Sequence, residues 1–238
     1  MIIKNNFKRG TAVKILFYGL MGADIISAYS NFVQYRLLKN AESGIEITSD
    51  QADTNDLRQQ VIAIIQVLLI LGTIITFVMW FHRAYKNLHR VSAPNLQYTS
   101  GWAAGSWFVP FLNLGRPYLI MKEIWNETQN FILPKDGFSR SSSTQIIGWW
   151  WAFWLFSSIL GNASGKMIAR ATTIDQLIPA TQISIVSDAV DMISMILTLI
   201  MVIRMMGYEQ LLSEKVNSPD ISDREKHPQD LLMDIPAI

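Results

Sequence analysis

The sequence predicts an all-α, polytopic integral membrane protein with four transmembrane helices and one interfacial or re-entrant amphipathic segment. Half of the 238 residues are apolar and only 16% are charged, whereas soluble domains carry about 25% charged residues. Long apolar runs recur along the chain, and each is long enough to cross a bilayer as a helix. The expected spans are residues 12–33, 61–82, 145–165 and 183–206, within a membrane domain of residues 1–206.

Two of these spans contain no charged side chain. Residues 61–81 are 21 consecutive uncharged positions, and fourteen of them are Val, Ile, Leu or Phe. A hydrocarbon core about 30 Å thick needs roughly 20 helical residues, so this run fits one crossing. The span at 145–165 lies in a second uncharged stretch, which carries four tryptophans: Trp149, Trp150, Trp151 and Trp154.

The other two spans contain aspartates. Residues 12–33 form a mainly apolar run with one acidic residue, Asp24, and residues 183–206 contain Asp188 and Asp191. Four basic residues precede or enter the first run, as they would in a signal peptide. An acidic residue inside the run and the lack of a clear small-residue cleavage site favour a retained span instead.

The distribution of basic residues orients the spans. Fifteen of the twenty Lys and Arg residues lie in the N-terminal segment, the loop at 82–145 and the tail from Arg204 onward. Because basic residues are enriched in cytoplasmic loops, both termini and the central loop are expected in the cytoplasm. The tail at 207–238 is acidic and weakly apolar, and we expect it to be disordered.

An interfacial segment is expected at residues 100–128. Only fourteen residues separate Gly101 from Arg116, too few for a helix to cross the membrane. We expect residues 101–114 to be helical or to tuck against the bundle. Pro117 suits the first turn of a second helix, which would place an apolar stripe against the cytoplasmic interface through residue 128. Arg83 is positioned either to pair with Glu123 of that helix or to remain free at the interface.

The middle of the chain carries a distinctive block of motifs. The block contains WFHRAYKNL at 80–88, GWAAGSWFVPFLNL at 101–114, GRPY at 115–118, EIW at 123–125 and GWWW at 148–151. Together, over roughly residues 10–206, these motifs resemble a family of bacterial membrane proteins described as domain of unknown function 4328. The resemblance implies a four-span protein of the bacterial inner (plasma) membrane, and it implies no activity.

Polar stripes on the spans define the candidate sites. On the fourth span, Asp188 and Asp191 lie with four Ser and Thr residues within about 120° of helical arc, and Asp24 lies on a similar stripe of the first span. Two interpretations of these intramembrane aspartates stay open: they hold helices together as protonated or hydrogen-bonded groups, or they bind a cation or relay protons. Candidate contacts at the cytoplasmic interface are Arg83, Asn113, Arg116 and Glu123.

The favoured function is non-enzymatic, through helix or tail contacts with other membrane components, including a second copy of the chain. The alternative is a small channel or carrier for cations or protons, and a membrane enzyme comes third because no catalytic constellation supports it. We expect no cofactor and no metal site, since the chain lacks cysteine and phosphate-loop or zinc-protease motifs. The expected partners are the lipid bilayer, with anionic headgroups at the cytoplasmic face, and unknown proteins. A net charge of +1 argues against nucleic acid.

Overall fold

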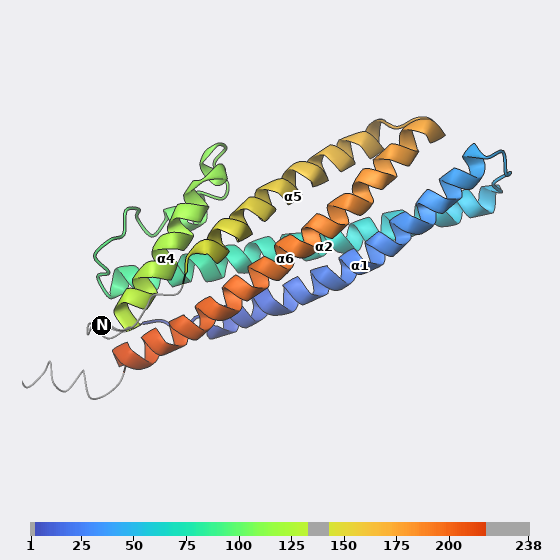
Figure 1. The fold of residues 1–238 in the computed structure, drawn as a ribbon. Coiled ribbons are helices and arrows are strands. Elements are labelled where there is room, and N and C mark those ends of the chain that lie inside the picture. The colour runs from blue at the N-terminus through green and yellow to red at the C-terminus, as the bar shows by residue number, and fades with distance from the viewer. Residues whose placement is uncertain (1–2, 133–142, 218–238) are drawn as a thin grey trace, which may run out of the picture. The chain divides into compact units, whose positions relative to one another are not determined.

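The computed structural model describes residues 3–132 and 143–217, and every regular element in these ranges is helical. Four helices are long and three elements are short (Figure 1). The elements are α1 (Phe7–Glu42), α2 (Ser49–Arg90), α3 (Trp102–Gly105), η1 (Leu112–Leu114), α4 (Arg116–Ile132), α5 (Gln145–Arg170) and α6 (Ile174–Asn217). The all-helical prediction is therefore confirmed for this part of the chain.

The chain divides into two compact units. The first, called here the four-helix unit, contains Thr11–Phe77 and Gln145–Val202. The second, called here the α4 unit, contains the described residues of Met1–Gly10, Val78–Thr144 and Ile203–Ile238. Helices α1, α2 and α6 contribute residues to both units.

A tight hairpin joins α1 to α2. Gly44 adopts a left-handed conformation (φ 83°), and the amides of Gly44 and Ile45 bond to the carbonyls of Ala41 and Asn40, which closes the last turn of α1. Thr48 and Gln51 then start α2 as a capping box, in which each side chain bonds to the other residue's backbone amide. Most of residues 34–60, expected as a loop, is consequently helical.

The four-helix unit buries polar side chains and exposes aliphatic ones. Polar residues from all four helices are buried, including Asp24, Asn31, Thr73, Ser164 and Ser187. The apolar stretch of α2 is only 11% buried, and α6 turns isoleucines away from its neighbours. The exposed isoleucines of α6 in this unit are Ile174, Ile193, Ile196 and Ile200. Apolar side chains such as Phe17 and Leu199 are buried as well, but the many buried polar groups beneath an exposed aliphatic surface differ from a water-soluble core.

Polar and aromatic contacts link the four helices of this unit in a ring, so that each helix contacts two others. Asp24 of α1 accepts a bond from Gln66 of α2, and Asn31 of α1 donates to Asp188 of α6. Ser164 of α5 bonds to Ser184 of α6. The last contact of the ring joins α2 to α5, where the ring centroids of Phe77 and Trp150 lie 6.3 Å apart.

Three described helices are long and apolar enough to cross a membrane: α1, α2 and α6. The expected count was four, because α5 was predicted to span at 145–165. Helix α5 falls short by composition: its four tryptophans carry ring N–H groups, and its second half adds Ser157, Ser158 and Asn162 to its aliphatic residues. Tryptophan also prefers the membrane–water interface to the hydrocarbon core.

The α4 unit has an apolar core. Trp80, Phe81 and Leu88 of α2 are buried in it with the stripe expected on α4, whose members Ile120, Met121, Ile124 and Trp125 are fully buried. Glu127 of α4 is 5% exposed and accepts a bond from Asn95. Residues 101–114 form α3, a turn and η1 rather than one continuous helix. Phe111 in this stretch has a φ of 65° and is 86% exposed.

The C-terminal tail is helical farther than expected. Disorder was predicted from residue 207, but α6 continues to Asn217, and residues 218–238 lie outside the described ranges. Packing explains the difference, because Leu212 is buried and Lys215 donates a hydrogen bond to the carbonyl of Phe131. An acidic composition did not reveal these anchoring contacts.

Candidate functional site

Asp24, Asp188 and Asp191 meet in the four-helix unit. Asp24 is buried on α1, and Asp188 and Asp191 lie one turn apart on α6, where both are half-buried. Ser27, three residues after Asp24 on α1, lies 3.5 Å from Asp188, so the carboxylates of the two helices lie along the same α1–α6 contact. We call the three aspartates the aspartate cluster.

The partners of the aspartate cluster are amides and hydroxyls. Gln66 Nε2 donates to Asp24 Oδ1 at 2.9 Å, and Asn31 Nδ2 donates to Asp188 Oδ2 at 2.8 Å. Ser157 of α5 donates to Asp191. Additional hydroxyl donors stand at 3.5 Å, Ser27 Oγ beside Asp188 and Ser187 Oγ beside Asp191.

No basic side chain neutralises the cluster within the described ranges, where the one ion pair joins Lys39 to Glu42. A carboxylate in an apolar span costs about 2.5–3.5 kcal/mol on insertion scales. Three neighbouring carboxylates add mutual repulsion. The arrangement therefore requires a proton or a cation to neutralise the carboxylates, or water to solvate them.

The four predicted interface residues all lie in the α4 unit, but they do not form one site. Glu123 accepts bonds from the Tyr85 hydroxyl at 2.5 Å and the Gln97 amide at 3.2 Å. Burial raises the pKa of Glu123, and these hydrogen bonds oppose the shift. Arg83 was expected either to pair with Glu123 or to remain free at the interface. Within the described residues, Arg83 forms no ion pair with Glu123.

Arg116 instead packs on aromatic rings at the start of α4. Its guanidinium carbon lies 4.3 Å from the ring centroid of Trp102 and 5.1 Å from that of Tyr98. Such contacts contribute about 0.5–1 kcal/mol at exposed sites. Asn113 lies in η1, where its backbone amide bonds to Val109. These two residues thus shape the turn from η1 into α4.

Sequence reasoning missed a second carboxylate site, at Glu209 of α6, three residues beyond the apolar run 183–206. Glu209 Oε1 accepts a bond from Asn6 Nδ2 at 2.8 Å, and Oε2 accepts one from Trp80 Nε1 at 3.0 Å. Asn6 also donates to the Trp80 carbonyl at 3.0 Å. Burial raises the pKa of Glu209 to about 7, although both hydrogen bonds act in the opposite direction. Nothing in local spacing links residues 6, 80 and 209.

Comparison with known proteins gives one family. A family model described as a domain of unknown function (DUF4328) matches residues 44–207. The matched range includes the motif block and two members of the aspartate cluster, Asp188 and Asp191. It begins later than the expected residue 10, so Asp24 lies outside it. Neither a curated protein nor a solved structure matches the chain.

The raised pKa of Glu209 predicts a pH-dependent stability. The folded chain binds this proton more tightly than the unfolded chain, whose glutamate titrates near 4.5. The contribution is therefore fully present below about pH 4.5 and is lost as pH rises through about 7. Thermal unfolding of the detergent-solubilised chain from pH 4.5 to 8 should show Glu209→Gln losing less stability than the wild type. Glu214→Gln, at an exposed carboxylate on the same helix, is the control, and equal pH slopes for all three chains would contradict the prediction.

Proposed function

The chain belongs to the family of the domain of unknown function DUF4328, and on this premise we propose that it is a non-enzymatic bacterial inner-membrane protein with four spans and cytoplasmic termini. It acts through contacts of its helices and its tail with other membrane components. The observation that carries the proposal is the polar interior and aliphatic exterior of the four-helix unit. In hydrocarbon, this distribution pairs most of the buried polar groups internally and leaves mainly aliphatic side chains against lipid.

The contacts of α5 support it as the fourth span. Ser157 and Ser164 bond to α6, and Trp150 lies against Phe77 of α2. A bilayer that surrounds α1, α2 and α6 would therefore surround α5 too. Its 26 residues reach about 39 Å at 1.5 Å per residue, more than a hydrocarbon core about 30 Å thick.

The exposed aliphatic face of α2 is the main contact surface we propose. Leu68 is 64% exposed and Ile64 is 61% exposed in the middle of the apolar run. Such a face accepts lipid, a partner helix or a second copy of the chain. Anionic headgroups at the cytoplasmic side are further proposed partners, because most basic residues are expected there.

The four-span topology is tested by reporter fusions at residues 45, 110, 172 and 225. The distribution of basic residues predicts exported reporters at 45 and 172 and cytoplasmic reporters at 110 and 225. An exported reporter at 110 or 225 would exclude this orientation. If the reporters at 110, 172 and 225 were all cytoplasmic, neither α5 nor α6 would cross the membrane, and the four-span topology would be wrong.

The contact function is tested by a photo-crosslinking side chain placed at Leu68 of the full chain in native membranes. Because this position is exposed, we expect a covalent adduct with another protein or with a second copy. Thr73, 6% exposed in the same run, is the matched control and should give no intermolecular protein adduct. Adducts with lipid alone at position 68 would count against α2 as a protein-contact surface.

A second candidate function, a small channel or carrier for cations or protons, is favoured by the aspartate cluster. Its three carboxylates come from two helices and are bonded by amides and hydroxyls rather than by basic side chains. Intramembrane carboxylates with such partners are typical of ion and proton pathways. The packing interpretation uses the same contacts, so only a functional measurement separates the two.

That measurement is proton or monovalent-cation flux into proteoliposomes that contain the full chain. Asp→Asn substitution at positions 24, 188 and 191 preserves side-chain shape and removes the charge, so each variant should lose most of the flux. Asp53→Asn, at an exposed acid of α2, should retain it. Undiminished flux in the triple variant, or no flux from the wild type, would leave the aspartates with the packing role.

A further inference from the structure

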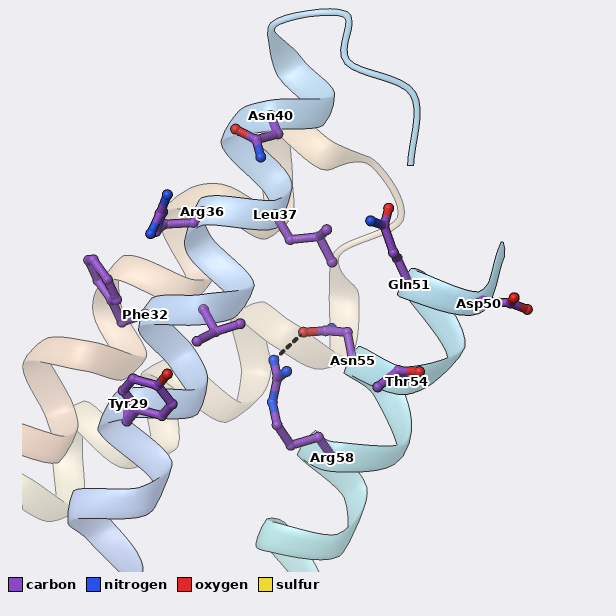
Figure 2. A pocket seen from close by; sticks show the side chains of 11 residues that line it. Tyr29, Phe32, Arg36, Leu37, Asn40, Asp50, Gln51, Thr54, Asn55 and Arg58 are labelled. Carbon is purple, nitrogen blue, oxygen red and sulfur yellow. Dashed lines mark hydrogen bonds between the residues drawn. The ribbon is translucent and has the colours of Figure 1, made fainter. Parts of the chain in front are cut away.

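The connection from α3 to α4 exposes aromatic rings outside every expected span. Phe111 is 86% exposed and Phe108 is 68% exposed. Exposed rings on a span need no further occupant than lipid: Figure 2 shows Tyr29 and Phe32 on regular turns of α1, inside the expected span 12–33. Phe108 and Phe111 lie in non-helical backbone, so their exposure needs another explanation. We call residues 108–111 the aromatic tip.

Phe111 occupies the centre of a tight turn that its side chain disfavours. The Leu112 amide bonds to the Pro110 carbonyl at 2.8 Å across Phe111, whose φ is 65°. A positive φ at the centre of such a three-residue turn is rare and strained for a bulky residue, whereas glycine adopts it freely. Neither the turn nor packing within the α4 unit therefore accounts for a phenylalanine here. Its exposed ring points to an apolar partner outside the unit.

Contacts with α2 place the aromatic tip near the end of the apolar run of that helix. The uncharged run 61–81 ends at Phe81, and the ring centroid of Trp107, the residue before the tip, lies 5.8 Å from that of Phe81. Tyr98 lies farther along α2, where its carbonyl accepts a bond from the Tyr85 hydroxyl at 3.0 Å. From residue 98 to residue 107 the chain therefore turns back toward the expected span.

Helix α4 then carries the chain away from the expected spans. The ring centroid of Trp125 lies 5.3 Å from that of Tyr208, just beyond the apolar run 183–206 of α6. Two turns later, the carbonyl of Phe131 accepts a bond from Lys215, which is farther from that run. The start of α4, and the aromatic tip before it, therefore lie at the end of the α4 unit where α2 and α6 meet their apolar runs.

The side chains around the aromatic tip suit the region between headgroups and acyl chains. Residues 91–122 contain no acidic side chain, whereas Arg116 and Lys122 follow the tip. Arg116 packs on the Trp102 ring, and Lys122 Nζ lies 5.6 Å from the Tyr118 ring centroid. Aromatic rings are enriched at the membrane–water interface, and basic side chains near it attract anionic headgroups.

The backbone of this segment is largely satisfied without water. The amides of Phe108, Leu112, Asn113 and Leu114 bond to carbonyls of residues 105, 110, 109 and 111. Pro110 has no amide hydrogen to satisfy. Internal pairing of this kind lowers the cost of moving backbone from water to the edge of the hydrocarbon.

We propose that the aromatic tip inserts Phe108 and Phe111 among the acyl chains of the leaflet next to the α4 unit, while Arg116 stays at the headgroups. The inference rests on the proposed membrane insertion of α2 and α6, and under the proposed topology this leaflet is the cytoplasmic one. The tip takes the interfacial role expected of the apolar stripe on α4, because that stripe is buried in the α4 unit.

The test is electron paramagnetic resonance of the full chain in vesicles of phosphatidylethanolamine and phosphatidylglycerol. The chain has no cysteine, so one spin label can be attached through Val109→Cys. We expect this label to collide readily with oxygen, which concentrates in hydrocarbon, and to be protected from a water-soluble nickel chelate. Combining Phe108→Ser with Phe111→Gly, which also relieves the positive φ, should abolish that protection. A label at Asn130→Cys, exposed near the other end of α4, is the matched control and should meet nickel in both backgrounds.

Each other outcome counts against the inference. A label at position 109 that is open to nickel shows a tip in water, and one protected from both reagents shows a protein partner or a second copy. Protection that survives the loss of both rings also overturns the inference. If the combined variant does not fold, Phe108→Ser alone, at an exposed side chain, gives the same readout.

A reference label at Leu68→Cys, in the apolar run of α2, separates the two levels of the argument. Nickel access at both 68 and 109 would overturn the proposed membrane insertion as well. Nickel access at 109 with protection at 68 would overturn this inference alone.

Discussion

The polar interior of the four-helix unit is the constraint on which its arrangement depends. When aliphatic side chains face outward, each buried polar group must find a partner inside the unit, because an unpaired polar group in an apolar medium costs several kcal/mol. Asp24 finds Gln66, Asp188 finds Asn31, and Asp191 finds Ser157. These pairs join α1 to α2, α1 to α6 and α5 to α6, so satisfying the carboxylates also determines which helices are neighbours.

The α4 unit follows the opposite rule, although it uses parts of the same helices. Along α6, Ser194 and Thr198 are buried beside Met195, Leu199 and Met201 in the four-helix unit, whereas the residues buried in the α4 unit are all apolar: Met205, Met206 and Leu212. Apolar burial is favourable where the outside is water, and the more apolar interior of the α4 unit agrees with the cytoplasmic position proposed for its residues. Asn6, Trp80 and Glu209 then fasten three chain segments through one carboxylate. The change in interior along α6 marks where its surroundings change.

The sequence predicts which helices exist and which faces are polar, because apolar runs and a 3.6-residue period are local patterns. It predicts their ends poorly. Gly44 and the Thr48–Gln51 capping box are local signals that indicate a tight hairpin, yet the polar composition of residues 34–60 favoured a loop. The Asn6–Trp80–Glu209 contacts, and the preference of Glu123 for Tyr85 over Arg83, depend on tertiary approach that no spacing encodes. Composition alone does not predict how helix α5 packs. Its tryptophans lower its hydropathy, yet its contacts with α2 and α6 place it within the four-helix unit.

The partners of the aspartate cluster are chemically unequal, and this inequality bears on what the cluster can do. A carboxylate needs donors, whereas a carboxylic acid also needs an acceptor for its own proton. Hydroxyls supply either, so Ser157 and Ser187 can serve Asp191 in both forms. Asp24 receives an amide N–H from Gln66, and Asn31, which donates to Asp188, has its own oxygen engaged by Gln59 at 3.3 Å. A hydroxyl can therefore turn to serve either form of Asp191, and Ser27 at 3.5 Å offers Asp188 the same, whereas the amide N–H that Gln66 donates to Asp24 serves only as a donor. A packing role uses only the donors, whereas the proposed proton or cation pathway would also use hydroxyls that can change between donor and acceptor.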